Sequence, residues 1–231
     1  MALRHSFIDV TPLRTMPTFR RLFIGRAFSG FGSQLTLVAV LFQAWQQTRS
    51  TIWTGAVGLA QAVPLIVLGL AAGSLIDRTD RRRLSLVTTV GQAVCSVLLA
   101  GQALLGHAPV LALLALVAVQ ACFGAVGAPA ARTFIPRLLP ADQLAAGMAL
   151  NRISFQAALL IGPAIGGLLI AAVGVDGCYV VDALTFGLGL YGAWGLPIRR
   201  PEGGTARPGF GGVIDGLAFL FGKPTCAAPC C

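Results

Sequence analysis

The sequence predicts an all-α integral membrane protein built around a bundle of six transmembrane helices, and two observations carry this prediction. First, 56% of the 231 residues are hydrophobic and only 11% are charged, with a mean hydropathy of +0.81. Soluble domains carry about 25% charged residues. Second, the apolar residues gather in six runs separated by short polar stretches. Each run is near the roughly 20 residues that a helix needs to cross a bilayer.

The six runs set the organisation of the chain. We expect a polar tail at 1–21, the helical bundle at 22–197, and a Gly- and Pro-rich linker with the start of another helix at 198–222. The last residues, 223–231, do not continue that helix, so we expect a truncated chain. In chain order, the predicted transmembrane helices are Leu22–Trp45, Ile52–Ile76, Leu84–Leu105, Pro109–Ala131, Leu144–Val173 and Tyr179–Leu196.

The distribution of arginine predicts the orientation of the bundle. The loops on one side are rich in arginine, whereas those on the other side contain only Arg49. Cytoplasmic loops of membrane proteins carry an excess of positive charge, so we expect both ends of this multi-pass chain to lie in the cytoplasm. The arginines of the predicted cytoplasmic loops are Arg78, Arg81, Arg82, Arg83, Arg132, Arg137, Arg199, Arg200 and Arg207.

The densest cluster of charge lies between the second and third predicted helices, where residues 73–83 read GSLIDRTDRRR. These charges are too costly for hydrocarbon, so the segment is expected to be a water-facing turn. The pattern here is a glycine, three further residues, Asp-Arg and then a basic pair. This pattern resembles the corresponding loop of the major facilitator superfamily of transporters. The matching residues are Gly73, Asp77, Arg78, Arg81 and Arg82. The resemblance implies that this turn latches the cytoplasmic face by salt bridges that break in each transport cycle.

The fifth predicted helix carries a second resemblance. Gly162, Pro163, Gly166 and Gly167 match the Gly-Pro-x-x-Gly-Gly signature of fifth helices in exporters of the same superfamily. The preceding segment, 128–151, is similar to the branch that includes siderophore and macrolide exporters.

Together the two resemblances imply the N-terminal half of a twelve-helix transporter, with its six helices arranged as two three-helix repeats. They imply export of a small amphipathic molecule, drug- or siderophore-like, by alternating access coupled to an ion, with protons as the candidate. The expected location is the bacterial inner (plasma) membrane. The small-residue faces formed by Gly69 with Gly73 and by Gly162 with Gly166 are expected to pack against the missing C-terminal half.

Polar side chains inside the predicted helices are candidates for lining a cavity, because polar groups in a membrane usually face protein or water. Gln34 shares a helix face with Arg26 and Gly30. For Arg26, reaching back to the membrane surface is an equal alternative. On the fifth predicted helix, Asn151, Arg152 and Gln156 are candidates, and Arg152 would suit an anionic substrate or pair with a carboxylate.

Asp182 is the only acidic residue clearly inside a predicted transmembrane helix. Two readings stay open for it: a buried carboxyl group that exchanges protons, or a packing contact with Thr185. Gln120 stands where many proton antiporters of the superfamily carry an arginine, so coupling through an arginine at that position is not expected.

Other classes of protein find little support. The net charge of +9 could indicate nucleic-acid binding, but the basic residues fall in short clusters between apolar runs. The cysteines and the two histidines show no metal-ligand spacing, so neither a metal nor a cofactor is expected. An integral membrane enzyme would need a cluster of reactive side chains, yet the only glutamate is Glu202, in the linker. The remaining alternative is a non-transporting membrane fragment or scaffold.

Overall fold

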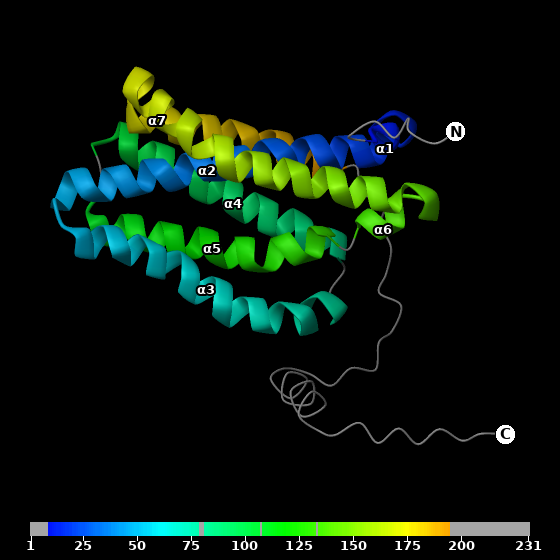
Figure 1. Cartoon of the computed structure of the whole chain (residues 1–231). Coiled ribbons are helices and arrows are strands. Elements are labelled where there is room, and N and C mark those ends of the chain that lie inside the picture. Colours follow the sequence, from blue (N-terminus) through cyan, green and yellow to red (C-terminus); the bar gives the residue numbers. More distant parts are fainter. Residues whose placement is uncertain (1–8, 79–80, 107, 133, 195–231) are drawn as a thin grey trace, which may run out of the picture.

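The structure is a computed structural model that describes residues 9–78, 81–106, 108–132 and 134–194. All regular secondary structure in these residues is helical (Figure 1). The helices are α1 Thr11–Thr15, α2 Pro17–Thr48, α3 Thr51–Arg78, α4 Arg81–Leu104, α5 Val110–Arg132, α6 Ile135–Leu138 and α7 Ala141–Trp194. By length and composition, α2, α3, α4, α5 and α7 can each cross a membrane.

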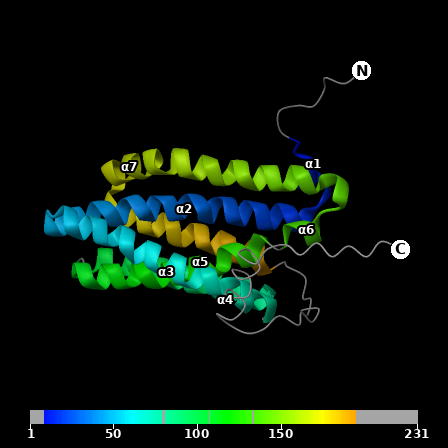
Figure 2. The ribbon, with the colours of Figure 1, turned by 60° about the horizontal axis from the view of Figure 1, so that its bottom comes forward.

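Helix α7 folds back on itself at Gly174. Its 54 residues would measure about 81 Å if straight, well over the roughly 30 Å of a bilayer core. Gly174 has a φ of 79°, which glycine adopts without strain, and the thiol of Cys178 lies 3.8 Å from the carbonyl oxygen of Gly166. Figure 2 shows the two arms running along opposite sides of α2, one coloured green to yellow and the other orange. The described residues therefore contain six membrane-length runs, as predicted.

The arrangement of these runs as two three-helix repeats stays a prediction. At the N-terminus, α2 begins at Pro17, five residues before the predicted start at Leu22, because proline is well suited to the first turn of a helix. The predicted tail 1–21 therefore contains α1 and the first turn of α2. Residues 1–8, the linker 198–222 and the final segment 223–231 lie outside the described residues.

Helix α2 lies at the centre of the bundle, flanked by both arms of α7 (Figure 2). Its contacts with the first arm, 141–173, run in parallel. The partners in α2 are Phe19 with Gly147, Gly30 with Ala158, Gln34 with Gly162, and Val38 with Gly166, and Thr15 at the end of α1 continues the series with Gln143; each pair is 128 residues apart. The constant separation shows that the segment 15–38 and the first arm lie alongside each other in the same direction.

The second arm of α7, 175–194, packs on α2 in the opposite direction. Four contacts follow one another along α2: Arg21 with Gly192, Gly25 with Gly189, Ser29 with Thr185, and Gly32 with Asp182. A Cβ atom on Gly25 would lie 2.9 Å from the carbonyl oxygen of Leu188. Small residues therefore let the two backbones approach closely.

The core holds side chains from α2, α3, α4, α5 and the second arm of α7, among them Val40, Val57, Leu99, Leu113 and Tyr179, all fully buried. Helix α3 lies at the edge of the bundle (Figure 1) and leaves large apolar side chains such as Leu59 and Ile66 exposed. An apolar exterior is what lipid requires of a membrane-spanning bundle.

Candidate functional site

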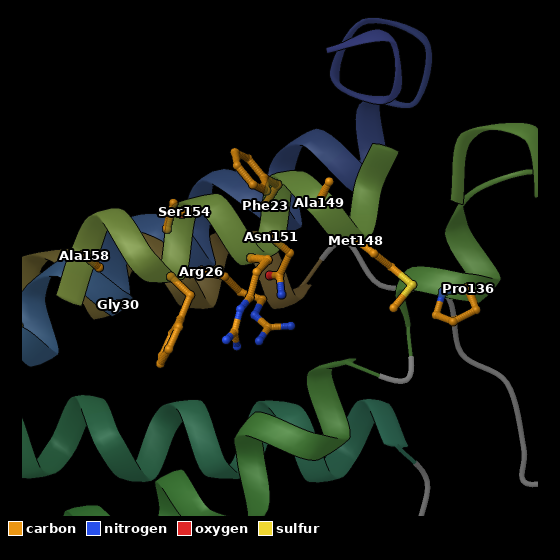
Figure 3. Close-up of a pocket in the computed structure, with 12 residues that line it drawn as sticks. Phe23, Arg26, Gly30, Pro136, Met148, Ala149, Asn151, Ser154 and Ala158 are labelled. Carbon is orange, nitrogen blue, oxygen red and sulfur yellow. The ribbon is translucent and has the colours of Figure 1, made fainter. Parts of the chain in front are cut away.

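A cavity of about 560 Å³ lies between the N-terminal part of α2, the first arm of α7 and the short helix α6. Helix α2 contributes Phe23, Arg26 and Gly30, because these positions recur at three and four residues and so share a face. Figure 3 shows Arg26 and Asn151 pointing into the same space, while Met148 and Pro136 lie at the end nearer α6.

Two arginines from facing helices line this cavity. Arg26 lies about 14 Å along α2 from its first residue, and Arg152 lies about 17 Å along α7 from its first residue. Because the two helices run in parallel, the arginines stand at a similar depth. The guanidinium of Arg152 is 6.0 Å from the centre of the Phe155 ring, within the range of a cation–π contact. Among the described residues that line the cavity, none is acidic.

Two smaller cavities of about 190 Å³ each continue from this one along α2. The first shares Arg26 and Gly30 with the large cavity and is lined by hydroxyl groups, including Ser85 and Thr88 of α4. The second shares Gln92 and Gly124 with the first. Because neighbouring cavities share lining residues, they form a polar row that reaches Gln34 and Gln120.

Beside the end of this row, Asp182 is completely buried. Ser96 of α4 donates a hydrogen bond of 2.7 Å to Oδ2 of Asp182, and the side-chain amide of Gln120 on α5 donates one of 3.1 Å to the hydroxyl of Ser96. Thr36 of α2 also lies next to the carboxyl group. The Oδ1 atom has no donor in good geometry among the described residues. The carboxyl group is thus held between four helical segments by uncharged groups.

Gly32 explains how Asp182 comes so close to α2. A Cβ atom at Gly32 would collide with the side chains of both Asp182 and Thr185. Thr185 makes its own hydrogen bond, 2.7 Å, to the main-chain oxygen of Asp182 rather than to the carboxyl group. The packing contact between these two residues is therefore real, but it leaves the carboxyl group available to Ser96.

A second buried polar cluster lies near the opposite end of the bundle. Gln43 of α2 and Gln102 of α4 exchange two hydrogen bonds of 3.1 Å, and the Tyr179 hydroxyl donates one of 2.7 Å to Gln43. Gln102 also accepts a hydrogen bond from the main-chain amide of Ala108 in the following loop. This cluster joins α2, α4 and the second arm of α7 where the large cavity does not reach.

The residues predicted to line a cavity separate into three groups. Asn151 and Arg152 line the large cavity together with Arg26, and Gln34 lines the far end of the polar row. Gln156 is exposed and does not belong to the described cavities. Asp182 is buried beside the row and does not line it.

The glycines of the fifth predicted helix require a correction. Gly162 and Gly166 were expected to face a missing half, but both are buried against α2. A Cβ atom at Gly162 would lie 2.6 Å from Cβ of Gln34, and one at Gly166 would lie 3.4 Å from Cβ of Val38. Gly167 is exposed, and neither it nor Gly69 has another group within 4 Å of an added Cβ. Gly162 and Gly166 of the signature thus serve packing inside this bundle.

The charged turn is described only in part. Gly73, Asp77 and Arg78 belong to the last turns of α3 and Arg81 begins α4, whereas residues 79–80 and the side chains of these four lie outside the described residues. Arg82 donates a hydrogen bond of 3.0 Å to the main-chain oxygen of Trp194 at the end of α7. The latch stays a prediction, and Arg82 links the turn to the second arm of α7.

Sequence reasoning missed several residues of these sites. Phe155 and Met148 carried no signal, because aromatic and apolar side chains fill every membrane helix. Gln120 stood out in the sequence, but its connection to Asp182 through Ser96 depends on three-dimensional packing. Gln43 could have been found, since a glutamine within an apolar run is costly unless it has a partner.

Comparisons with known proteins agree with the resemblances. The profile of a major facilitator family described as "Transmembrane secretion effector" matches residues 8–219. Over 219 residues the chain is 33% identical to the multidrug efflux pump Tap of Mycobacterium tuberculosis (strain ATCC 25618 / H37Rv), covering 89% of this chain and 51% of the relative. Over 218 residues it is 27% identical to the enterobactin exporter EntS of Escherichia coli O1:K1 / APEC, covering 94% and 52%. No solved structure matches the chain.

The chain therefore spans about half the length of the curated relatives that it matches. A family match over most of the chain, together with six membrane-length helical runs, defines its class. The chain is a multi-pass membrane protein that belongs to the transmembrane secretion effector family of major facilitator transporters.

Proposed function

We propose that this chain forms the N-terminal half of an exporter that moves a small amphipathic molecule across the bacterial inner membrane by alternating access. The observation that carries the proposal is the polar row of cavities along α2, which runs from Arg26 and Arg152 to Gln34. A polar path inside an otherwise apolar bundle is costly, and in membrane proteins it usually marks a route for substrate or ions. The relatives named as a multidrug pump and an enterobactin exporter support the direction of transport.

The proposed substrate site is the large cavity at the beginning of this row. Its volume, about 560 Å³, falls within the roughly 300–1,000 Å³ of small-molecule sites. Phe23, Met148 and Phe155 offer apolar surface, and Asn151 and Arg152 offer hydrogen-bond donors. This mixture suits an amphipathic molecule. In this proposal both ends of the chain lie in the cytoplasm, so the cavity, which is near the N-terminal ends of α2 and α7, loads from the cytoplasmic side.

Asp182 is the proposed site of proton coupling. The groups that face its carboxyl group are Thr36 from α2, Ser96 from α4 with Gln120 behind it on α5, and Gly32; none of these is charged or titratable near neutral pH. A buried carboxylate with only neutral neighbours must take up a proton or hold a cation. The polar row passes Gln120, which gives protons a route to this group. Gln120 would thus act as a relay where other antiporters place an arginine.

The charged turn completes the proposed cycle. Asp77 and the arginines around it would hold the cytoplasmic face closed, and Arg82 would transmit this state to α7 through its hydrogen bond with Trp194. Alternating access then needs a second half that rocks against the first. Because the chain covers only about half of its relatives, a non-transporting membrane fragment is the second candidate function.

Flux measurements in lipid vesicles separate the two candidates. The chain is reconstituted alone, and in parallel with the C-terminal half of a relative. The accumulation of an anionic probe, 1-naphthalenesulfonate, and of a cationic probe, ethidium, is followed under an imposed pH gradient. Export predicts accumulation above empty vesicles only when both halves are present. A transporting relative reconstituted whole serves as the positive control. If the two halves bind each other but no gradient drives accumulation, the exporter proposal fails in favour of the non-transporting fragment.

A further inference from the structure

We infer that the large cavity between α2 and the first arm of α7 selects anionic amphipathic molecules, which have an aromatic or aliphatic body and one acidic group. This inference rests on the proposed transport function for its biological meaning, but the binding it describes can be measured separately. It goes beyond that function by naming the charge of the ligand and the residues that read it.

The first argument is the charge of the lining. Arg26 and Arg152 approach from two parallel helices, and the described residues that line the cavity include no acid. Arginine stays protonated at every physiological pH, so the lining carries two fixed positive charges. Two like charges in one cavity repel each other, and a bound anion relieves this repulsion, whereas a bound cation would increase it.

The second argument is depth. The two arginines lie about 14 Å and 17 Å from the first residues of their helices, and the segment between carries apolar residues such as Phe23 and Met148. An arginine near a membrane surface extends its head group to water. Here the half-buried Arg26 and the exposed Arg152 both line the cavity between the helices, and Figure 3 shows Arg26 and Asn151 pointing into the same space.

The third argument is the chemistry around the charges. Guanidinium groups bind carboxylates and similar oxyanions with two parallel hydrogen bonds, and the Asn151 amide adds further donors. Phe23, Phe155, Met148 and Ala158 line the rest of the cavity. One part therefore recognises an oxyanion and the other an apolar body. An anionic phospholipid has the same chemistry as a free anionic amphiphile, so the experiment must distinguish the two sources.

Binding is measured by equilibrium dialysis on the 231-residue chain in phosphatidylcholine nanodiscs, with empty nanodiscs subtracted. The probes are 1-naphthalenesulfonate and 1-naphthylmethylammonium, which share an aromatic body and differ in charge. We expect the anion to bind at least tenfold more tightly than the cation. Arg152→Gln should weaken anion binding about tenfold without weakening cation binding, whereas Arg152→Lys should retain most of the preference. Arg49→Gln, which removes an exposed arginine from a loop, is the matched control.

Repeating the dialysis with phosphatidylglycerol in the nanodiscs identifies the source of the anion. Loss of sulfonate binding to the wild type, together with retention of phosphatidylglycerol through detergent extraction, would assign the cavity to a lipid head group. Unchanged sulfonate binding would assign it to free amphiphiles.

Equal binding of the two probes, or an Arg152→Gln variant that is helical by circular dichroism and binds the anion normally, would overturn the inference. Charge-selective binding without transport would remove the proposed function and leave the inference standing. Transport with no preference for anions would support the proposed function and overturn the inference.

Discussion

Replacing Gly25 by alanine should destabilise the bundle, because α2 and the second arm of α7 meet there backbone to backbone. The new methyl group would lie 2.9 Å from the Leu188 carbonyl oxygen and 3.1 Å from the Gly189 Cα. Neither atom belongs to a flexible side chain, so the two helices must separate. Forcing extra volume into a packed interface costs about 1–3 kcal/mol, and the better helix propensity of alanine returns about 1 kcal/mol. Because these contacts are with backbone atoms, we expect a cost near the upper end of that range. The free energy of unfolding should then fall by about 2 kcal/mol.

Gly58→Ala is the matched control. Gly58 lies inside α3, is exposed, and has no other group within 4 Å of an added Cβ. This variant should gain helix propensity without a collision and be stabilised by up to about 1 kcal/mol. Both variants are compared with the wild type by titration with sodium dodecyl sulfate in mixed micelles, with circular dichroism as the readout. If Gly25→Ala unfolds at the same or a higher detergent fraction than the wild type, the close approach described between α2 and α7 is wrong.

Three further predictions concern topology, coupling and the charged turn. A cysteine at exposed Arg83 should react with an impermeant maleimide only from the cytoplasm, and one at Arg49 only from outside; labelling of both from one face would contradict the proposed orientation. Asp182→Asn should abolish uphill transport but permit downhill flux, measured at several pH values in vesicles that contain both halves. Unimpaired accumulation would exclude Asp182 as the coupling group. In a complete transporter, Asp77→Asn should lower transport at least tenfold with normal membrane insertion, whereas unchanged flux would reduce this carboxylate to a topology signal.

The membrane-spanning runs could be predicted from the sequence because their length and apolar character are local properties. The reversal at Gly174 was predictable for the same reason, since Gly174 and Gly177 surround a short polar break containing Asp176. The helix boundaries differed by a few residues where Pro17 starts α2 earlier than hydropathy indicates.

The partners of individual residues could not be predicted, because they depend on which helices lie side by side. The sequence predicted that Gly162 and Gly166 form a contact surface, but no neighbouring residue indicates that this surface meets α2. Asp182 and Ser96 are 86 residues apart, so their hydrogen bond has no sequence signature. Gly25 and Gly32 form a close interface with the second arm of α7, yet glycines are so frequent in membrane helices that these two did not stand out.

The hairpin formed by α7 also bears on how the protein is made. Gly25 meets Leu188 and Gly189, and Arg21 meets Gly192, so α2 finds these neighbours only after the second arm of α7 has been synthesised. At about 5–20 residues per second, the ribosome needs about 10–30 s to cover that distance. During this interval α2 resides in the bilayer without the arms that will enclose it. The contacts of α2 with α7 therefore form late in synthesis, and a nascent chain halted before the hairpin emerges would expose the small-residue faces of α2 to lipid and to the insertion machinery.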